Sequence, residues 1–256
     1  GVTVLEDLPV IMGVVPLVRV EYKGLTYQES GPQLNASARE GTIQVKVYDT
    51  TEETPPWRIP MRHIMATPSP GGVAVTELVI VENPSDKTWL GKDPDDKGNR
   101  PTVELTLPGN AKDVKLESGF HGWCCTSYEG RDLRVRMPMM PGQARYRFSY
   151  VVPETEGAAL LCFVAPVLTD HVMLVLPDDG TTVSPAPDAA EVTPRASAEG
   201  GVKARVYQFD ALRPGQAAGL LVSGTLMAGS KPLTSKGLPL LTWLLGGVGC
   251  LIAAGL

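Results

Sequence analysis

Apolar and polar residues alternate along most of the chain before residue 225. This alternation places apolar side chains on one side of an extended backbone, so each run predicts a β-strand with one buried face. The first run, Leu17–Ser30, alternates on both sides of Lys23-Gly24 and predicts a β-hairpin. Further runs predict strands at 42–51, 73–85, 102–108, 113–118, 132–139, 144–153, 158–166, 171–177, 202–209 and 218–224.

Turn-forming residues separate these short runs. The chain contains 27 glycines and 23 prolines, which fall largely between the apolar stretches and predict turns. Residues 184–201, rich in proline, alanine and serine, predict an exposed loop or a short linker, and ATPSPGG at 66–72 predicts a domain boundary. We therefore expect an all-β chain of two immunoglobulin-like antiparallel β-sandwich modules followed by one C-terminal transmembrane helix.

The last 20 residues predict a membrane anchor, because 237–256 contain no charged side chain. As an α-helix they would span roughly 30 Å, the thickness of a bilayer's hydrocarbon core. Trp243 suits the membrane interface, and Gly246, Gly247 and Gly249 would let a neighbouring helix approach closely. The predicted division is a β-rich module at 1–66, a β-sandwich at 67–227, a linker at 228–236 and the helix at 237–256. The alternative for the tail is a helix buried in a protein core.

The composition and net charge of the chain limit the classes of partner that it can bind. The chain is 43% hydrophobic and 20% charged, which is typical of a globular protein. Its net charge is −5, and its basic residues are scattered, so we expect no nucleic-acid partner. The partners we expect are the lipid bilayer and other integral membrane subunits, the latter contacting the C-terminal helix.

Two stretches resemble a family of membrane-anchored bacterial and archaeal proteins with carboxypeptidase regulatory-like, immunoglobulin-like domains. They are VRVEYKGLTYQESGPQL with IQVKVYDTTEE, at 18–53, and the strands VTELVIVENPSDKTWLG, VELTLPGNA and MPGQARYRFSYVVP, at 75–153. The resemblance implies a non-catalytic β-sandwich on the periplasmic side of the membrane and an anchor near the C-terminus. This chain departs from the family pattern because little of a first domain precedes Val18.

Four cysteines are too few for a disulfide-built scaffold. Cys124 and Cys125 are adjacent and poorly placed to bond each other, which predicts a disulfide between Cys124 and Cys162. The alternative is three unpaired, buried thiols. Cys250 lies in the apolar tail, where it acts as a small hydrophobic residue.

No catalytic motif stands out, so we expect no enzyme activity, metal or cofactor. The three histidines, His63, His121 and His171, lie in separate segments, and the chain has no Gly-x-Ser-x-Gly, His-Glu-x-x-His or phosphate-binding glycine motif. A mixed site of His121 with the nearby cysteines is the less favoured alternative. Calcium binding in the loop that contains Asp93, Asp95 and Asp96 is also less favoured than a solvated loop.

Three functions remain. The leading prediction is a structural or accessory subunit of a larger membrane complex, such as a photosynthetic or respiratory assembly. The second is a stand-alone envelope module that binds a protein or carbohydrate through Trp57, Trp89 or Trp123; exposed tryptophans would favour it, and buried ones would favour the subunit. The third is a metal-dependent enzyme, which requires the histidines to converge.

Overall fold

The described part of the chain is built from strands alone. The computed structural model describes residues 2–6, 15–35, 37, 40–94, 98, 100–199 and 202–224, and within these ranges no helix occurs. The strands are β1 Leu17–Tyr22, β2 Leu25–Ser30, β3 Thr50–Thr51, β4 Arg58–Ser69, β5 Gly72–Asn83, β6 Thr88–Trp89, β7 Val103–Thr106, β8 Lys112–Ser118, β9 Thr126–Glu129, β10 Asp132–Val135, β11 Gly142–Pro153, β12 Ala158–Val164, β13 Thr169–Pro177, β14 Thr182–Pro185, β15 Thr193–Glu199, β16 Val202–Leu212 and β17 Ala217–Ser223. The all-β prediction is confirmed for these residues.

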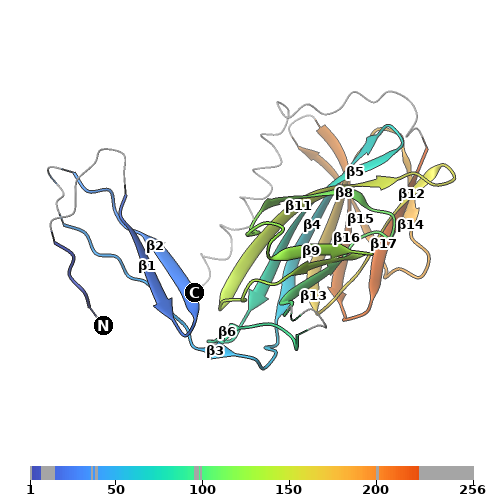
Figure 1. Ribbon diagram of the computed structural model, residues 1–256. Coiled ribbons are helices and arrows are strands. Elements are labelled where there is room, and N and C mark those ends of the chain that lie inside the picture. Colours follow the sequence, from blue (N-terminus) through green and yellow to red (C-terminus); the bar gives the residue numbers. More distant parts are fainter. Residues whose placement is uncertain are drawn as a thin grey trace.

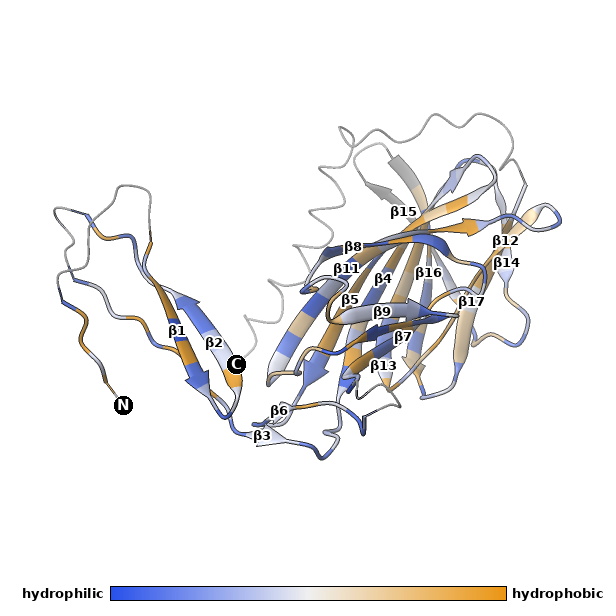
Figure 2. Ribbon diagram, viewed as in Figure 1, coloured by the Kyte–Doolittle hydropathy of each residue, from blue (hydrophilic) through white to orange (hydrophobic). Residues whose placement is uncertain are grey.

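Two layers of sheet enclose the core (Figure 1). One layer is a seven-stranded sheet in the order β15-β16-β13-β4-β5-β11-β8, and the other consists of the sheets β7-β10-β9 and β12-β17-β14. All pairs in these sheets are antiparallel except β4 with β13, which is parallel. Hydrophobic residues concentrate in the strands of both layers (Figure 2). The inward-facing core includes Val79, Phe148 and Leu174 from the large sheet and Leu105, Leu161 and Leu220 from the smaller sheets.

The predicted N-terminal hairpin forms as β1 and β2, which lie beside the sandwich (Figure 1). Its two turn residues, Lys23 and Gly24, both have positive φ angles, which suits the tight turns that match the twist of paired strands. Asp49 accepts hydrogen bonds from the Tyr22 hydroxyl at 2.9 Å and pairs with the Lys23 ammonium at 2.6 Å. These contacts tie the hairpin turn to the segment that leads into β3.

The domain boundary predicted between residues 66 and 67 is wrong, because it falls inside β4. The ATPSPGG segment forms the end of β4 and the tight turn into β5, and the two strands pair from Arg58↔Glu82 to Ser69↔Gly72. Proline and glycine are common both in hairpin turns and in interdomain linkers, so composition alone could not distinguish a turn from a linker. Residues 58–69 therefore belong to the large sheet and not to a separate N-terminal module.

Several strand predictions also need correction. The alternation at 42–51 yields only the two-residue β3, which pairs with β6, and the predicted loop at 184–201 contains β15. The alternation does not reveal β4, because the outward positions of this strand carry methionine and histidine. The predicted transmembrane helix at 237–256 lies outside the described residues, and so does the linker before it.

Candidate functional site

The loop Gly119–Cys125, which joins β8 to β9, gathers three side chains that can bind a metal ion. It begins at Gly119, whose φ angle is +85° and whose Cβ position would lie 1.8 Å from the Arg145 carbonyl oxygen. A side chain is therefore excluded where β8 leaves β11. Phe120 follows and packs against Tyr146 and Phe148, with ring centroids 5.0 and 6.2 Å away. This aromatic contact fixes the first half of the loop to the core.

The second half of the loop is a tight turn. The Cys125 amide donates to the Gly122 carbonyl at 3.2 Å, and Gly122 has a φ angle of +108°. The Arg136 amide then donates to the Cys125 carbonyl at 2.8 Å, which ties the turn to the residue following β10. Both ends of the loop are held by backbone or aromatic contacts. The backbone that carries the side chains of His121, Cys124 and Cys125 is therefore held in place.

These three side chains point their donor atoms at one another. The Cys124 sulfur lies 3.4 Å from His121 Nδ1 and 3.4 Å from the Cys125 sulfur, and the Cys125 sulfur lies 3.5 Å from His121 Nδ1. His121 and Cys124 are exposed, and Cys125 is half-buried. The hydrogen bond with Cys124 raises the pKa of the Cys125 thiol. The arrangement offers two thiols and one imidazole within reach of a single ion that solvent can also reach.

The predicted Cys124–Cys162 disulfide is not formed. Both residues are free thiols, as is Cys125, and Cys124 contacts its neighbour and His121 instead. Cys162 lies on the outward side of β12, since the alternating residues Leu161 and Phe163 enter the core. The alternative of three unpaired, buried thiols is correct in that all three are unpaired and wrong in that none of them is fully buried.

The other two histidines lie elsewhere. His63, in β4, is only 8% exposed, and its Nε2 atom has no hydrogen-bond partner. His171, in β13, is exposed, and its Nδ1 lies 2.7 Å from the Asp210 carboxylate. The parallel register of β13 with β4 pairs His171 with Met61 and His63 with Met173, so the two histidines belong to adjacent strands of the large sheet. His121 is not on this sheet.

The tryptophans divide between the core and the surface. Trp89 is fully buried and Trp57 is 7% exposed, so both belong to the core. Trp123 is 50% exposed and lies in the Gly119–Cys125 loop beside Cys124. By the criterion set out from the sequence, two tryptophans favour the accessory subunit and one favours a binding module.

The outward face of the large sheet carries a patch of half-buried apolar side chains, which we call the outer patch. Inward-facing residues such as Arg62 and Val79 contact the core, so their alternating neighbours face outward. Strand registers place these neighbours side by side across β5, β4, β13 and β16. The outer patch consists of the half-buried apolar residues Met61, Met65, Leu78, Ile80, Met173, Val175 and Val206, together with His63, which is buried among them. The sequence feature that could have indicated the outer patch is the run Leu78–Val81, in which consecutive residues, and therefore both faces of the strand, are apolar.

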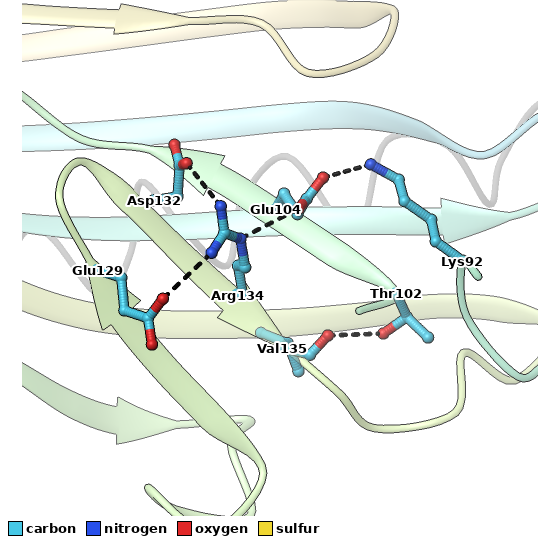
Figure 3. Close-up of polar contacts among 7 residues, drawn as sticks. All are labelled: Lys92, Thr102, Glu104, Glu129, Asp132, Arg134 and Val135. Atoms are coloured by element: carbon cyan, nitrogen blue, oxygen red, sulfur yellow. Dashed lines mark hydrogen bonds and ion pairs between the residues drawn. The ribbon is translucent and has the colours of Figure 1, made fainter. Parts of the chain in front are cut away.

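The outward face of the β7-β10-β9 sheet differs, because its charges are paired with one another (Figure 3). The Arg134 guanidinium contacts Glu104 at 3.2 Å, Asp132 at 3.0 Å and Glu129 at 3.5 Å. Lys92 also pairs with Glu104, and the Thr102 hydroxyl donates to the Val135 carbonyl at 3.2 Å. A half-exposed network of this kind is typical of a solvated sheet face. The outer patch therefore differs in character from this charged face. The β12-β17-β14 sheet also turns an apolar residue outward, Leu160, which is 41% exposed.

Inside the sandwich, Arg62 and Glu77 form a buried ion pair. Arg62 Nε donates to Glu77 Oε2 at 2.6 Å, and the Tyr150 hydroxyl donates to Glu77 Oε1 at 2.6 Å. The guanidinium also lies over the Phe163 ring, 4.2 Å from its centroid. Burial, together with the adjacent Glu77 carboxylate, raises the pKa of Tyr150 well above its ordinary value. The side chains of Arg62 and Glu77 are only 1% and 0% exposed, which suits a structural role.

The remaining predicted residues lie outside the described part of the chain. These are Trp243, Gly246, Gly247, Gly249 and Cys250 in the tail, and Asp95 and Asp96 in the acidic loop. A search of the described residues finds no helix with the length and apolarity needed to cross a bilayer.

Comparisons with known proteins yield only distant likenesses. No protein-family model matches the chain. No curated protein matches it either. Among solved structures, a candidate nutrient-binding protein from Legionella pneumophila is similar over 69% of this chain and 70% of its own, at 9% identity and a TM-score of 0.38. The resemblance to proteins with carboxypeptidase regulatory-like domains stays a prediction.

Two further likenesses cover small parts of larger proteins. Legionella pneumophila aminopeptidase A in complex with aspartic acid is 12% identical, with a TM-score of 0.36, and 68% of this chain matches 22% of that one. A candidate protease from Parabacteroides distasonis is 11% identical, with a TM-score of 0.34, and 65% of this chain matches 40% of that one.

Proposed function

We propose that this protein is a non-catalytic, membrane-anchored accessory subunit, whose β-sandwich contacts an integral membrane subunit on the periplasmic side. The apolar tail at 237–256 would hold the chain in the bilayer, with Gly246, Gly247 and Gly249 packing against another helix. An immunoglobulin-like sandwich and a photosynthetic or respiratory setting belong to the same proposal.

The outer patch is the observation that supports this proposal. An antiparallel sheet with one solvated face normally alternates apolar and polar residues, as the β7-β10-β9 sheet does. Met61, Met65 and Met173 instead make the centre of the large sheet apolar on its outward side, and they surround His63. Apolar patches of this kind mark contacts with other proteins, and methionine adapts readily to a partner's shape. The partner we propose is therefore an apolar periplasmic surface of a membrane subunit.

A second candidate function is a stand-alone envelope binding module. The exposed Trp123 supports it, because an aromatic ring in a fixed loop can pack against a protein or carbohydrate ligand. The two candidates differ in whether the chain migrates with a stable set of membrane proteins.

The test is gentle detergent solubilisation of native membranes, followed by native-gel separation and mass spectrometry. We expect the wild-type chain to migrate with a defined set of membrane subunits. Replacing Met65 with glutamate places a charge at the centre of the outer patch, and we expect this variant to migrate without some or all of that set. Ser149→Glu is the matched control, because Ser149 is a polar position on the same sheet face in β11.

Migration of the wild-type chain alone, near the mass of one or two copies, would contradict the accessory-subunit proposal. Unchanged migration of Met65→Glu would show that the outer patch is not the contact surface in this proposal. Circular dichroism of both variants checks that the sandwich is intact, since both substitutions lie on an outward face.

A further inference from the structure

The loop Gly119–Cys125 supports an inference that goes beyond the proposed function and does not depend on it. We propose that His121, Cys124 and Cys125 form a binding site for one thiophilic divalent metal ion of the Zn²⁺ type. Thiolate and imidazole groups are the ligands that such ions prefer. All three donor atoms lie within 4.8 Å of one another.

The spacing of the donor atoms favours tetrahedral over planar coordination. Bonds of about 2.3 Å to sulfur and about 2.0 Å to nitrogen place neighbouring ligands roughly 3.5 to 3.8 Å apart in a tetrahedron. A planar three-coordinate arrangement with the same bond lengths requires about 3.7 to 4.0 Å. The two distances from sulfur to His121 Nδ1, 3.4 and 3.5 Å, are close to the tetrahedral value, whereas the two sulfurs, 3.4 Å apart, would have to separate by about 0.4 Å. Small side-chain movements would admit the ion.

The fourth corner faces solvent, because the His121 and Cys124 side chains are exposed. A water molecule or a ligand from outside the chain can therefore complete the coordination, which distinguishes the site from closed, four-residue structural zinc sites. Binding replaces the thiol protons with the metal, and two thiolates balance the charge of a divalent ion. The site needs little reorganisation, since Phe120 and the Cys125 backbone already hold the loop.

The test is metal binding by the full-length chain, purified in detergent with its thiols kept reduced. Zn²⁺ is titrated in competition with a chromophoric chelator, and Co²⁺ provides a spectroscopic signal from its bonds to sulfur. We expect one Zn²⁺ per chain and an intense thiolate-to-cobalt absorption. Alkylation followed by peptide mass spectrometry should show that Zn²⁺ protects Cys124 and Cys125, two of the four cysteines in the chain.

Variants assign the ion to the loop. Cys124→Ser, Cys125→Ser and His121→Ala should each weaken Zn²⁺ binding by at least on the order of 100-fold, since losing only an outer-shell partner typically lowers affinity roughly 10- to 100-fold. Cys162→Ser is the matched control and should bind as the wild type does, because Cys162 is a free thiol on β12.

Three results would overturn the inference. The first is a wild-type chain that binds less than one Zn²⁺ per chain when fully reduced, and the second is equal binding by the Cys124→Ser/Cys125→Ser double variant. The third is tight binding of Cu⁺ without binding of Zn²⁺, which would contradict the tetrahedral assignment. None of these results bears on co-migration with membrane subunits, so the two proposals fail independently.

Discussion

At the scale of single residues, Arg62 and Glu77 place two opposite charges in an otherwise apolar core. Arg62 is 1% exposed and Glu77 is 0% exposed, so neither charge is solvated by bulk water. Their mutual contact, the Tyr150 hydroxyl and the Phe163 ring replace that water. A pair of this kind adds little net stability over apolar residues, but removing one partner leaves the other charge buried and unpaired.

We therefore predict that Arg62→Met and Glu77→Leu each lower the free energy of unfolding by about 3 to 5 kcal/mol. The double variant should recover most of that loss, because it removes both charges together. Urea unfolding of the full chain in detergent, followed by tryptophan fluorescence, measures all three. A double variant as unstable as the sum of the single variants would mean that the two residues are not energetically coupled, which would contradict the prediction.

His63 makes stability depend on pH. Burial lowers the pKa of this imidazole below its ordinary value of 6.5, because a charged ring is poorly solvated in the outer patch. The unfolded chain then binds a proton at a higher pH than the folded chain does. Stability from this group is present in full above about pH 6.5 and is lost as the pH falls toward the lowered folded pKa.

We predict that the urea midpoint of the wild-type chain falls more steeply below about pH 6.5 than that of His63→Leu. Met61→Leu is the control and should retain the wild-type slope, since it alters the same patch without removing a titratable group. Equal slopes for the wild type and His63→Leu would assign the pH dependence to other groups.

At the scale of the elements, most strands follow from the sequence. Alternation identified β1, β2, β5, β8, β11, β12, β13, β16 and β17 to within a few residues, because one face of each is apolar and the other is polar or mixed. It missed β4, whose outward positions carry Met61, His63 and Met65. The parallel pairing of β4 with β13 joins residues more than a hundred positions apart, and no local pattern reports such a contact.

The candidate site was only partly predictable. The sequence drew attention to GFHGWCC as unusual and allowed a mixed site of histidine and cysteine. It could not show that His121 meets both cysteines, because that depends on the turn at Gly122 and on where Phe120 packs. The disulfide prediction failed for the same reason: the distance between Cys124 and Cys162 depends on sheet order, which spacing along the chain does not fix.

Gly119 tests how the β8–β11 pairing positions the loop. Alanine at this position would bring a Cβ atom to 1.8 Å from the Arg145 carbonyl and would hold a strained φ angle. We predict that Gly119→Ala lowers the free energy of unfolding by about 1 to 3 kcal/mol and weakens Zn²⁺ binding. Gly109→Ala is the matched control, because its nearest side-chain atom would be 3.7 Å away. Urea unfolding of both variants measures the two free energies of unfolding. Equal values for Gly119→Ala and Gly109→Ala would contradict the predicted clash.

At the scale of the whole molecule, a β-sandwich with one apolar outer face precedes an uncharged tail of 20 residues. The paired charges on the β7-β10-β9 sheet suit solvent, whereas the outer patch suits a protein surface. The sandwich thus has one face that suits a protein partner and one that suits water. Such an arrangement is the one expected under the proposed accessory role.

We predict that a chain ending at Lys236 is released into the soluble fraction, while the full chain stays with membranes after alkaline carbonate washing. The tail supplies the anchoring in this interpretation, since its apolar length matches the bilayer core. Cell fractionation with an antibody against the sandwich measures the distribution. A truncated chain that remains membrane-bound at high pH would show that another part of the molecule is inserted.

The parallel β4–β13 pair limits the order in which the strands of the large sheet can pair during synthesis and folding. β4 lies in the middle of the large sheet, yet the strand that covers one of its edges begins only at Thr169. A ribosome must add about a hundred residues after β4, at roughly 5 to 20 residues per second, before that edge can be covered. During these seconds the β4–β5 hairpin presents an open edge and an apolar surface, both of which invite aggregation. We therefore predict that the chain depends on a chaperone that holds this hairpin until β13 and β16 are available, and that in the proposed periplasmic setting this chaperone acts on the exported side of the membrane.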